Sequence, residues 1–419
     1  MKKYFMSVAA LAGMMSLAAC SSDDIVSPAD NDVQTIKIAV ASTGDKSTRS
    51  RDLNSEEPGQ NIESVAVVIR DKANNVVYHK IITDWQTASN LYTDNGHGRE
   101  YTLKLEKDQR LNAGEYTITA VGYTAGDFKS NTIVDATKGN VAAGNFTAEV
   151  ADGKAAQEAF AGESSIKLLE DHEGINPSVT LHRQVAGYYG YFTSIPVEVN
   201  SKKVTNVRLV ARSKNMKLTY GNFNSNFTTT NSDIMYVVNG SEPATTKDAK
   251  FKGSAENDAY TVYNIKVDDW FTKGDTNNDG ILDEKDTDWT NALATKGYLT
   301  YQKGTIFAGG FAVPFAATAA ATLELQLLDG TGEILKSWTV EMATAQPAGQ
   351  DVDKVALPAE TTQNFSFFRN HMYTLGKKMD NTNTPGTTPD QPEPLDKSQS
   401  MILRVNDNWE VINRMTIGD

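Results

Sequence analysis

Hydrophobic and polar residues alternate with a period of two along most of the chain, which is the pattern of half-buried β-strands. The clearest stretches are 33–41, 65–69, 116–120, 179–181 and 323–327. Two of them, 65–69 and 323–327, are each followed by a turn headed by aspartate and then by a second apolar stretch. Helical periodicity is limited to two short segments, 155–160 and 290–295. The pattern predicts an all-β protein with two β-sandwich domains in tandem, 52–178 and 179–379.

The last part of the chain has a different pattern. Four of the twelve prolines lie in 380–397, so this segment is predicted to be an extended linker that joins no sheet. In 398–419 seven apolar residues share the odd parity, which predicts a one-faced strand that must pair with a sheet edge elsewhere. These seven residues are Met401, Leu403, Val405, Trp409, Val411, Met415 and Ile417.

The N-terminus has the features of a secretory signal peptide over residues 1–19. Lys2 and Lys3 precede an apolar stretch that is short for a membrane span. Small residues then lead to Cys20, as lipoprotein signal peptidase requires. We therefore expect Cys20 to be acylated and to anchor the precursor to the outer membrane. Residues 20–51 would form a lipidated propeptide that contains the strand 33–41.

Composition and charge exclude several classes of protein. With 40 Lys+Arg and 53 Asp+Glu, the formal net charge is −13, and no basic cluster interrupts the acidic background. This argues against a nucleic-acid partner. Cys20 is the only cysteine, which excludes an intramolecular disulfide and a cysteine-based metal site.

The sharpest local motif is DTNNDGILDEKD, residues 275–286, in the predicted second domain. Twelve-residue calcium loops place oxygen ligands at positions 1, 3, 5, 7, 9 and 12, with glycine at position 6. Aspartate at position 12 departs from the EF-hand and is similar to the dockerin loop. We expect a structural Ca²⁺ site, and a solvated Asp/Asn/Gly turn is the alternative. The predicted ligands are Asp275, Asn277, Asp279, the Ile281 carbonyl, Asp283 and Asp286.

Enzyme signatures are weak. The five histidines have no metal-ligand spacing, and the Ser-x-x-Lys at 164–167 lacks its companion motifs. The aromatic run 188–192 is more typical of core packing than of a sugar-binding platform. We therefore expect no enzymatic activity.

The order of these features resembles the fimbrillins, the pilins of the type V pili of Bacteroidales (the FimA/Mfa-like major fimbrial subunit family). The stretch LHRQVA, 181–186, is similar to the family's Arg-x-x-Ala strand. The stretch FRNHMY, 368–373, is similar to its Arg-Asn-x-x-Tyr closing strand. The resemblance spans nearly the whole chain and implies transthyretin-like sandwiches. The calcium loop is not part of the family pattern and resembles an insertion.

The resemblance also implies how such a protein would assemble on the cell surface. A trypsin-like protease would cut after Arg49 or Arg51 and release the lipid together with strand 33–41. The release of strand 33–41 would leave a groove in the first domain. The terminal strand of another copy, or of another fimbrial subunit, would then fill this groove and build a head-to-tail fimbria. Two other interpretations stay open: a fimbrial tip or accessory adhesin, and a monomeric lipid-anchored glycan-binding protein.

Overall fold

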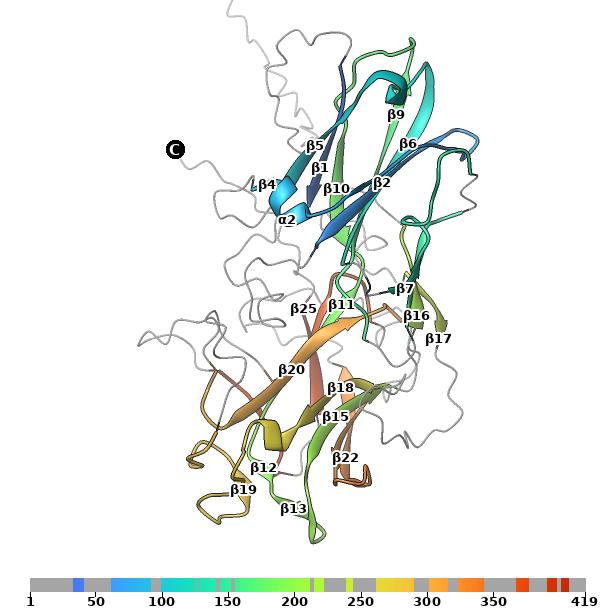
Figure 1. The fold of residues 1–419 in the computed structure, drawn as a ribbon. Coiled ribbons are helices and arrows are strands. Elements are labelled where there is room, and N and C mark those ends of the chain that lie inside the picture. Colours follow the sequence, from blue (N-terminus) through green and yellow to red (C-terminus); the bar gives the residue numbers. More distant parts are fainter. Residues whose placement is uncertain are drawn as a thin grey trace, which may run out of the picture.

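The structure is a computed structural model, shown in Figure 1. It describes residues 33–40, 62–91, 99–124, 126, 128–140, 144–151, 155–211, 215–221, 239–243, 261–289, 301–315, 323–342, 367–376, 390–397 and 401–406. The described residues are almost entirely β, so the predicted all-β class is confirmed. None of the helices in these ranges has the length and hydropathy needed to cross a lipid bilayer.

The first sheet has eight strands in the order β3-β2-β6-β9-β10-β1-β5-β4. All pairs are antiparallel except β1 with β10, which is parallel. The strands are β1 Gln34–Val40, β2 Ser64–Asp71, β3 Val76–Ile82, β4 Asn90–Leu91, β5 Arg99–Leu105, β6 Gly114–Tyr123, β9 Phe160–Leu168 and β10 Ser178–Arg183.

The second large sheet runs β18-β15-β21-β22-β25-β23-β11-β20, with β24 paired to β11 beside this path. Its outermost strands, β18 and β20, lie close together, so the sheet curls back on itself (Figure 1). The strands are β11 Ala186–Thr193, β15 Asn206–Ala211, β18 Thr261–Lys266, β20 Thr305–Ala312, β21 Leu323–Leu328, β22 Ile334–Met342, β23 Met372–Leu375, β24 Glu393–Pro394 and β25 Met401–Asn406.

Smaller elements complete the fold. A four-stranded sheet, β17-β16-β8-β7, and two short ribbons, β12-β19 and β13-β14, accompany the large sheets. These elements are β7 Phe128–Asn131, β8 Thr147–Val150, β12 Ile195–Pro196, β13 Glu198–Val199, β14 Lys202–Lys203, β16 Asn215–Thr219, β17 Gly240–Pro243, β19 Ile281–Leu282, the helix α2 Trp85–Ala88 and the 3-10 turns η1 Lys107–Gln109 and η2 Val267–Asp269.

The two predicted aspartate-headed turns have the same hydrogen-bond pattern. Oδ1 of Asp71 accepts the backbone N–H groups two and four residues later, at 2.9 and 2.8 Å. Oδ1 of Asp329 does the same at 2.8 and 2.9 Å. In each turn the fourth residue has a positive φ, 64° at Asn74 and 83° at Gly332. Asparagine and glycine tolerate this conformation, which explains why both hairpins turn here.

The division into domains is less simple than the expected boundary at 178/179. The first sheet continues through β10, and the chain enters the second sheet at β11, after residues 184–185. The four-stranded sheet also pairs β8 with β16, which come from the two predicted domains. The described residues form two apolar cores, one on a face of the first sheet and a larger one that contains residues of both large sheets. The tandem arrangement of two sandwich domains stays a prediction.

Two of the predictions from local pattern are wrong. Residues 155–160 are not helical, because Ala156 makes a bridge to Phe311 and β9 begins at Phe160. The proline-rich segment does join a sheet, because β24 pairs in parallel with the end of β11. β23 pairs with β11 only as far as Gly190, and β24 pairs with β11 beyond that point. Leu395, which follows β24, is fully buried. The other predicted helix, 290–295, lies outside the described residues.

Six residues of the predicted terminal donor strand 398–419, Met401–Asn406, belong to the chain's own second sheet. β25 runs parallel to β22 and antiparallel to β23, and it joins these two strands into one sheet. Met401 at its start is fully buried. The expectation that the strand stands alone beyond a linker is therefore wrong for Met401–Asn406. Trp409, Val411, Met415 and Ile417 lie outside the described residues.

We expect Gly162→Ala to destabilise the first sheet. A Cβ at Gly162, on β9, would lie against the backbone carbonyl oxygen of Thr180 on β10, which cannot move aside without breaking the sheet. The expected loss is roughly 1–3 kcal/mol or more in the free energy of unfolding, measured in urea. Gly330→Ala is the control, because its Cβ would meet only Thr205 Cγ2 at 3.8 Å. Equal stability of the two variants would contradict this packing.

Candidate functional site: the β1 groove and the 275–286 loop

β1 is an interior strand, although a long stretch of sequence separates it from β2. It pairs along its full length with β5 and over Lys37–Val40 with β10. Ile36, Ile38 and Val40 are 0–1% exposed and face the first core. On the opposite face, the Lys37 ammonium lies 3.3 Å from the Glu100 carboxylate. The strand predicted from the alternation at 33–41 therefore lies between β5 and β10 (Figure 1). We call the place that it occupies between these two strands the β1 groove.

The buried face of β1 begins with a polar residue, Gln34, which is 0% exposed. Its Nε2 donates to the carbonyls of Leu111 at 3.0 Å and Glu173 at 2.8 Å. Its Oε1 accepts the Leu111 N–H at 2.6 Å. Sequence analysis missed Gln34, although its parity, shared with Ile36, places it on the apolar face. An amide on such a face is a sign of a buried polar contact.

The LHRQVA and FRNHMY stretches lie side by side where the chain crosses between the large sheets. The Asn370 N–H donates to the Val185 carbonyl, and the Gly187 N–H donates to the His371 carbonyl, both at 2.8 Å. From there β11 and β23 continue as a parallel pair. The two stretches begin at residues 181 and 368, which are 187 positions apart in the sequence. They nevertheless form one structural unit.

A buried ion pair stabilises this crossing. Arg183 and Glu158 have side chains that are 0% and 1% exposed, and Arg183 Nε and Nη2 both donate to Glu158 Oε1, at 2.9 and 2.6 Å. The guanidinium also lies over the Phe160 ring, 4.7 Å from its centroid. Glu158 falls in the segment predicted to be helical, so sequence analysis gave no sign of this pair. Removal of either side chain alone would leave the other as a buried charge without its partner, which is destabilising.

His371 is also buried at the crossing. Its Nδ1 lies 2.8 Å from the Arg369 carbonyl, which can only accept, so Nδ1 carries the proton of the neutral ring. Burial lowers the pKa of His371 to about 4, and the Arg369 guanidinium also lowers it. Arg369 itself is 1% exposed and donates to the Gly221 carbonyl at 2.7 Å.

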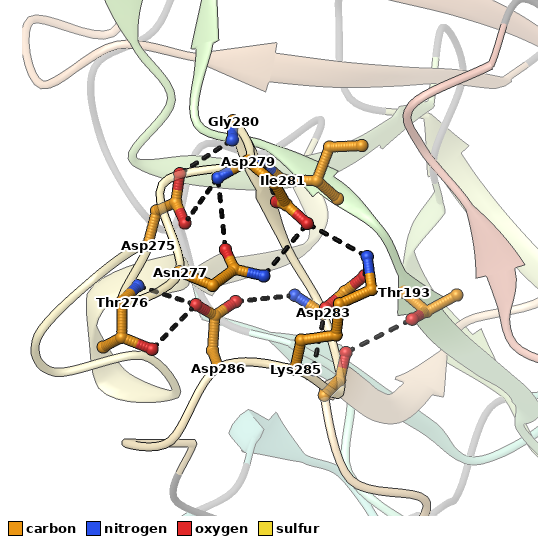
Figure 2. A network of polar contacts seen from close by, with 11 residues as sticks. Thr193, Asp275, Thr276, Asn277, Asp279, Gly280, Ile281, Asp283, Lys285 and Asp286 are labelled. Carbon is orange, nitrogen blue, oxygen red and sulfur yellow. Dashed lines mark hydrogen bonds and ion pairs between the residues drawn. The ribbon is translucent and has the colours of Figure 1, made fainter.

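The predicted calcium loop has the backbone of an Asx-rich turn (Figure 2). Asp275 accepts the Gly280 N–H at 2.8 Å, and Asp279 accepts the Ile281 N–H at 3.1 Å. Asp283 accepts the Lys285 N–H at 2.8 Å. These bonds fold all the oxygen-bearing side chains of the motif into one loop.

Two other predicted ligands, the buried Asp286 and the exposed Asn277, differ from each other in burial. Asp286 is 0% exposed, and its two carboxylate oxygens accept the backbone N–H groups of Thr276 at 2.7 Å and Asp283 at 2.9 Å. Asn277 accepts the Asp279 N–H at 3.2 Å through Oδ1. The loop is attached to the second sheet through β19, which pairs with β12. This attachment suits a structural role.

The cation among these carboxylates is a lysine side chain. Lys285 Nζ lies 3.0 Å from Asp279 Oδ2 and 3.2 Å from Asp283 Oδ2 (Figure 2). Its hydrogen bond to Asp279 raises the pKa of Lys285 and lowers that of Asp279. Within the described ranges, no group of three or more acidic, histidine or cysteine side chains is arranged to hold a metal ion. The donors are the hard oxygens that Ca²⁺ prefers, but two of them are paired with Lys285.

The aromatic run on β11 belongs to the core, as favoured from the sequence. Tyr188, Tyr189, Tyr191 and Phe192 are 0–4% exposed. Tyr191 donates to Asp390 at 3.0 Å from the edge of this core. The run therefore presents no stacking surface for a sugar. The predicted lipidation site Cys20 and the predicted cleavage sites Arg49 and Arg51 lie outside the described residues.

Comparisons with known proteins gave matches only among solved structures. No family model matches the chain, and no curated protein matches it. The chain is similar to the fimbrial anchor protein Mfa2 from Porphyromonas gingivalis, with 12% identity, a TM-score of 0.38, and coverage of 90% of this chain and 98% of that one. It is also similar to a fimbrial assembly protein from Parabacteroides distasonis, with 12% identity, a TM-score of 0.37, and coverage of 84% and 93%. Likenesses of this size do not establish a family or a function.

We expect His371 to make stability depend on pH. Its pKa is lower in the folded protein, so between about pH 4 and pH 6.5 the unfolded chain binds more protons. Stability from this group is present above pH 6.5 and is lost as the pH falls towards 4, by roughly 3 kcal/mol in total. The test is urea unfolding of the wild type and His371→Gln from pH 7 to 4. The gap between the two curves should change across this window, and parallel curves would contradict the assignment.

Proposed function

We propose that the protein is a structural subunit of a cell-surface fimbria and has no enzymatic role. It is exported as a lipoprotein through Cys20, cut after Arg49 or Arg51 by a trypsin-like protease, and polymerised with other copies or other fimbrial subunits by strand addition. The proposal rests on one observation. β1 is an interior strand of the first sheet, and both arginines lie in the sequence between β1 and β2. A cut there would disconnect a buried strand without cutting any other described element.

The physical consequence of such a cut follows from the burial of β1. Its departure would expose Ile36, Ile38 and Val40 and their partners, at roughly 1.5–3 kcal/mol for each side chain. It would also leave the inner edges of β5 and β10 without a ladder partner. A groove of this kind binds another strand by backbone hydrogen bonds and selects it by alternate side chains. Strand addition between successive copies does not close, so it builds a filament.

The protein from the cell surface should begin at residue 50 or 52 if the chain is processed and polymerised. N-terminal mass spectrometry measures this directly. Lipidated Cys20 at the start of the surface protein would instead support an anchored, uncut protein, as in the monomeric glycan-binding interpretation. Substitution of both Arg49 and Arg51 by glutamine should leave the precursor uncut and monomeric, whereas either single substitution should not.

Truncation after Asn406 should abolish polymerisation and leave a folded monomer. β25, Met401–Asn406, pairs with two strands of its own sheet, so a longer deletion that removes it should unfold the second sheet instead. Size-exclusion chromatography after protease treatment reports the polymers, and circular dichroism reports the fold. Polymers that persist after truncation at Asn406 would contradict donation by the terminal segment.

We also propose that residues 275–286 bind Ca²⁺ in a structural role, with the Lys285 ammonium displaced from Asp279 and Asp283. The oxygen donors and the attachment of the loop through β19 support this. We expect calcium to raise the melting temperature over a chelator control at matched ionic strength. Lys285→Ala should bind calcium roughly two- to five-fold more tightly, because it removes an exposed competing cation. Lys203→Ala, which breaks an exposed ion pair elsewhere, is the control. No calcium response in any of the three proteins would refute the site.

A further inference from the structure

The β1 groove contains a site for a side-chain carboxamide. A primary amide has two N–H donors and one carbonyl acceptor, and all three are used by Gln34. Its partners are the Leu111 carbonyl, the Glu173 carbonyl and the Leu111 N–H, at 3.0, 2.8 and 2.6 Å. Each partner is a backbone group of the loops around the groove, so the site stays in place when its occupant changes. A carboxylate could not donate to the two carbonyls. An alkyl side chain would leave the Leu111 N–H and the Glu173 carbonyl without this partner, whereas the Leu111 carbonyl would keep the His172 N–H at 3.0 Å.

Arg99 lies at the other end of the β1 groove, beside the position of Val40. Val40 lies opposite Arg99 on β5, so the two side chains share the inner face. Arg99 Nη1 donates to the Gln86 carbonyl at 2.6 Å. Its Nε is buried and has no hydrogen-bond partner among the described residues. A strand that placed a carboxylate at the position of Val40 would meet this guanidinium.

One segment of the chain carries the complementary side chains at the required spacing. β1 presents Gln34, Ile36, Ile38 and Val40 to the groove. In the sequence, an amide, two apolar residues and a carboxylate recur with the same period of two after β25: Asn413, Met415, Ile417 and Asp419. In the same alignment Ala39 corresponds to Gly418, and the exposed-face residue Lys37 to Thr416.

We propose that the carboxamide site selects and registers the incoming strand, and that its occupant is Asn413–Asp419 of a second copy of this chain, placed in the direction of β1. This rests on the proposed strand addition and specifies its register. The direction follows from the ladders, since only a strand that runs as β1 does is parallel to β10 and antiparallel to β5. Asn413 takes the place of Gln34, and Asp419 faces Arg99.

The test uses the full chain after limited cleavage between β1 and β2, mixed with fluorescent peptides and followed by anisotropy. The first peptide covers residues 33–41 and reports whether the groove exchanges its strand at all. The second covers residues 409–419 and is amidated at its end, so that the Asp419 side chain is the only carboxylate there. Variants of the second peptide are Asn413→Leu, Asn413→Gln and Asp419→Asn. Thr416→Lys is the matched control on the exposed face.

We expect both unmodified peptides and Thr416→Lys to bind. Asn413→Leu should bind roughly ten-fold more weakly or worse, because the Leu111 N–H and the Glu173 carbonyl lose their partner. Asn413→Gln should bind at least as tightly as the unmodified peptide, since glutamine is the residue that fills the site in β1. Asp419→Asn should bind more weakly, with a loss that shrinks as salt is added.

The outcomes separate this inference from the proposed function. If the 33–41 peptide does not enter the cut protein, strand exchange itself fails. If that peptide enters and the 409–419 peptide does not, the proposed occupant is wrong. If both enter and Asn413→Leu binds as tightly as the unmodified peptide, the carboxamide site does not select the strand.

Discussion

The first sheet depends on the insertion of β1 between β5 and β10. Without β1, the strands β4 and β5 have no ladder to the other strands of the sheet, and the inner faces of β5 and β10 lose the three apolar side chains that cover them. Along the chain, β1 is joined to the other strands of this sheet only through the segment between β1 and β2. An interior strand attached through a single connection is the kind of element that can be replaced, because its position is defined by neighbours that remain when it leaves.

Buried polar side chains determine the register in which the strands of the first sheet pair. Gln34 fixes the register of β1, since a shift by one residue would turn its amide to the outside and leave the Leu111 N–H and the Glu173 carbonyl without this partner. At the crossing between the large sheets, the Arg183–Glu158 pair does similar work for β9 and β10. Both are contacts whose strength comes from satisfied geometry in a dry environment, and both would be costly with one partner missing.

Much of the fold follows from local pattern, and the failures have physical causes. The alternation predicted β1, β2 and β21, and the two aspartates predicted the turns, because these depend on residues close in sequence. The predicted helix at 155–160 failed because Ala156 makes a bridge to Phe311, which is far away in the sequence, and β9 begins at Phe160. The prediction that the proline-rich segment joins no sheet failed because β23 pairs with only part of β11, and β24 pairs with a later part of it. In the candidate site, the loop at 275–286 could be recognised from its spacing, whereas the competing role of Lys285 needed coordinates.

The sequence by itself determined the period of the alternating strands β1, β2 and β21, the apolar residues on β1, and the two aspartate-headed turns, because these are set by neighbours within a few positions. Only the tertiary structure decided which edges those strands join. The pattern at Met401–Asn406 demanded a sheet partner but could not distinguish a second copy from the gap between β22 and β23. The same holds for Gln34, whose partners lie 77 and 139 residues away. Pairing over such distances depends on the packing of the whole chain, which no local pattern of side chains encodes.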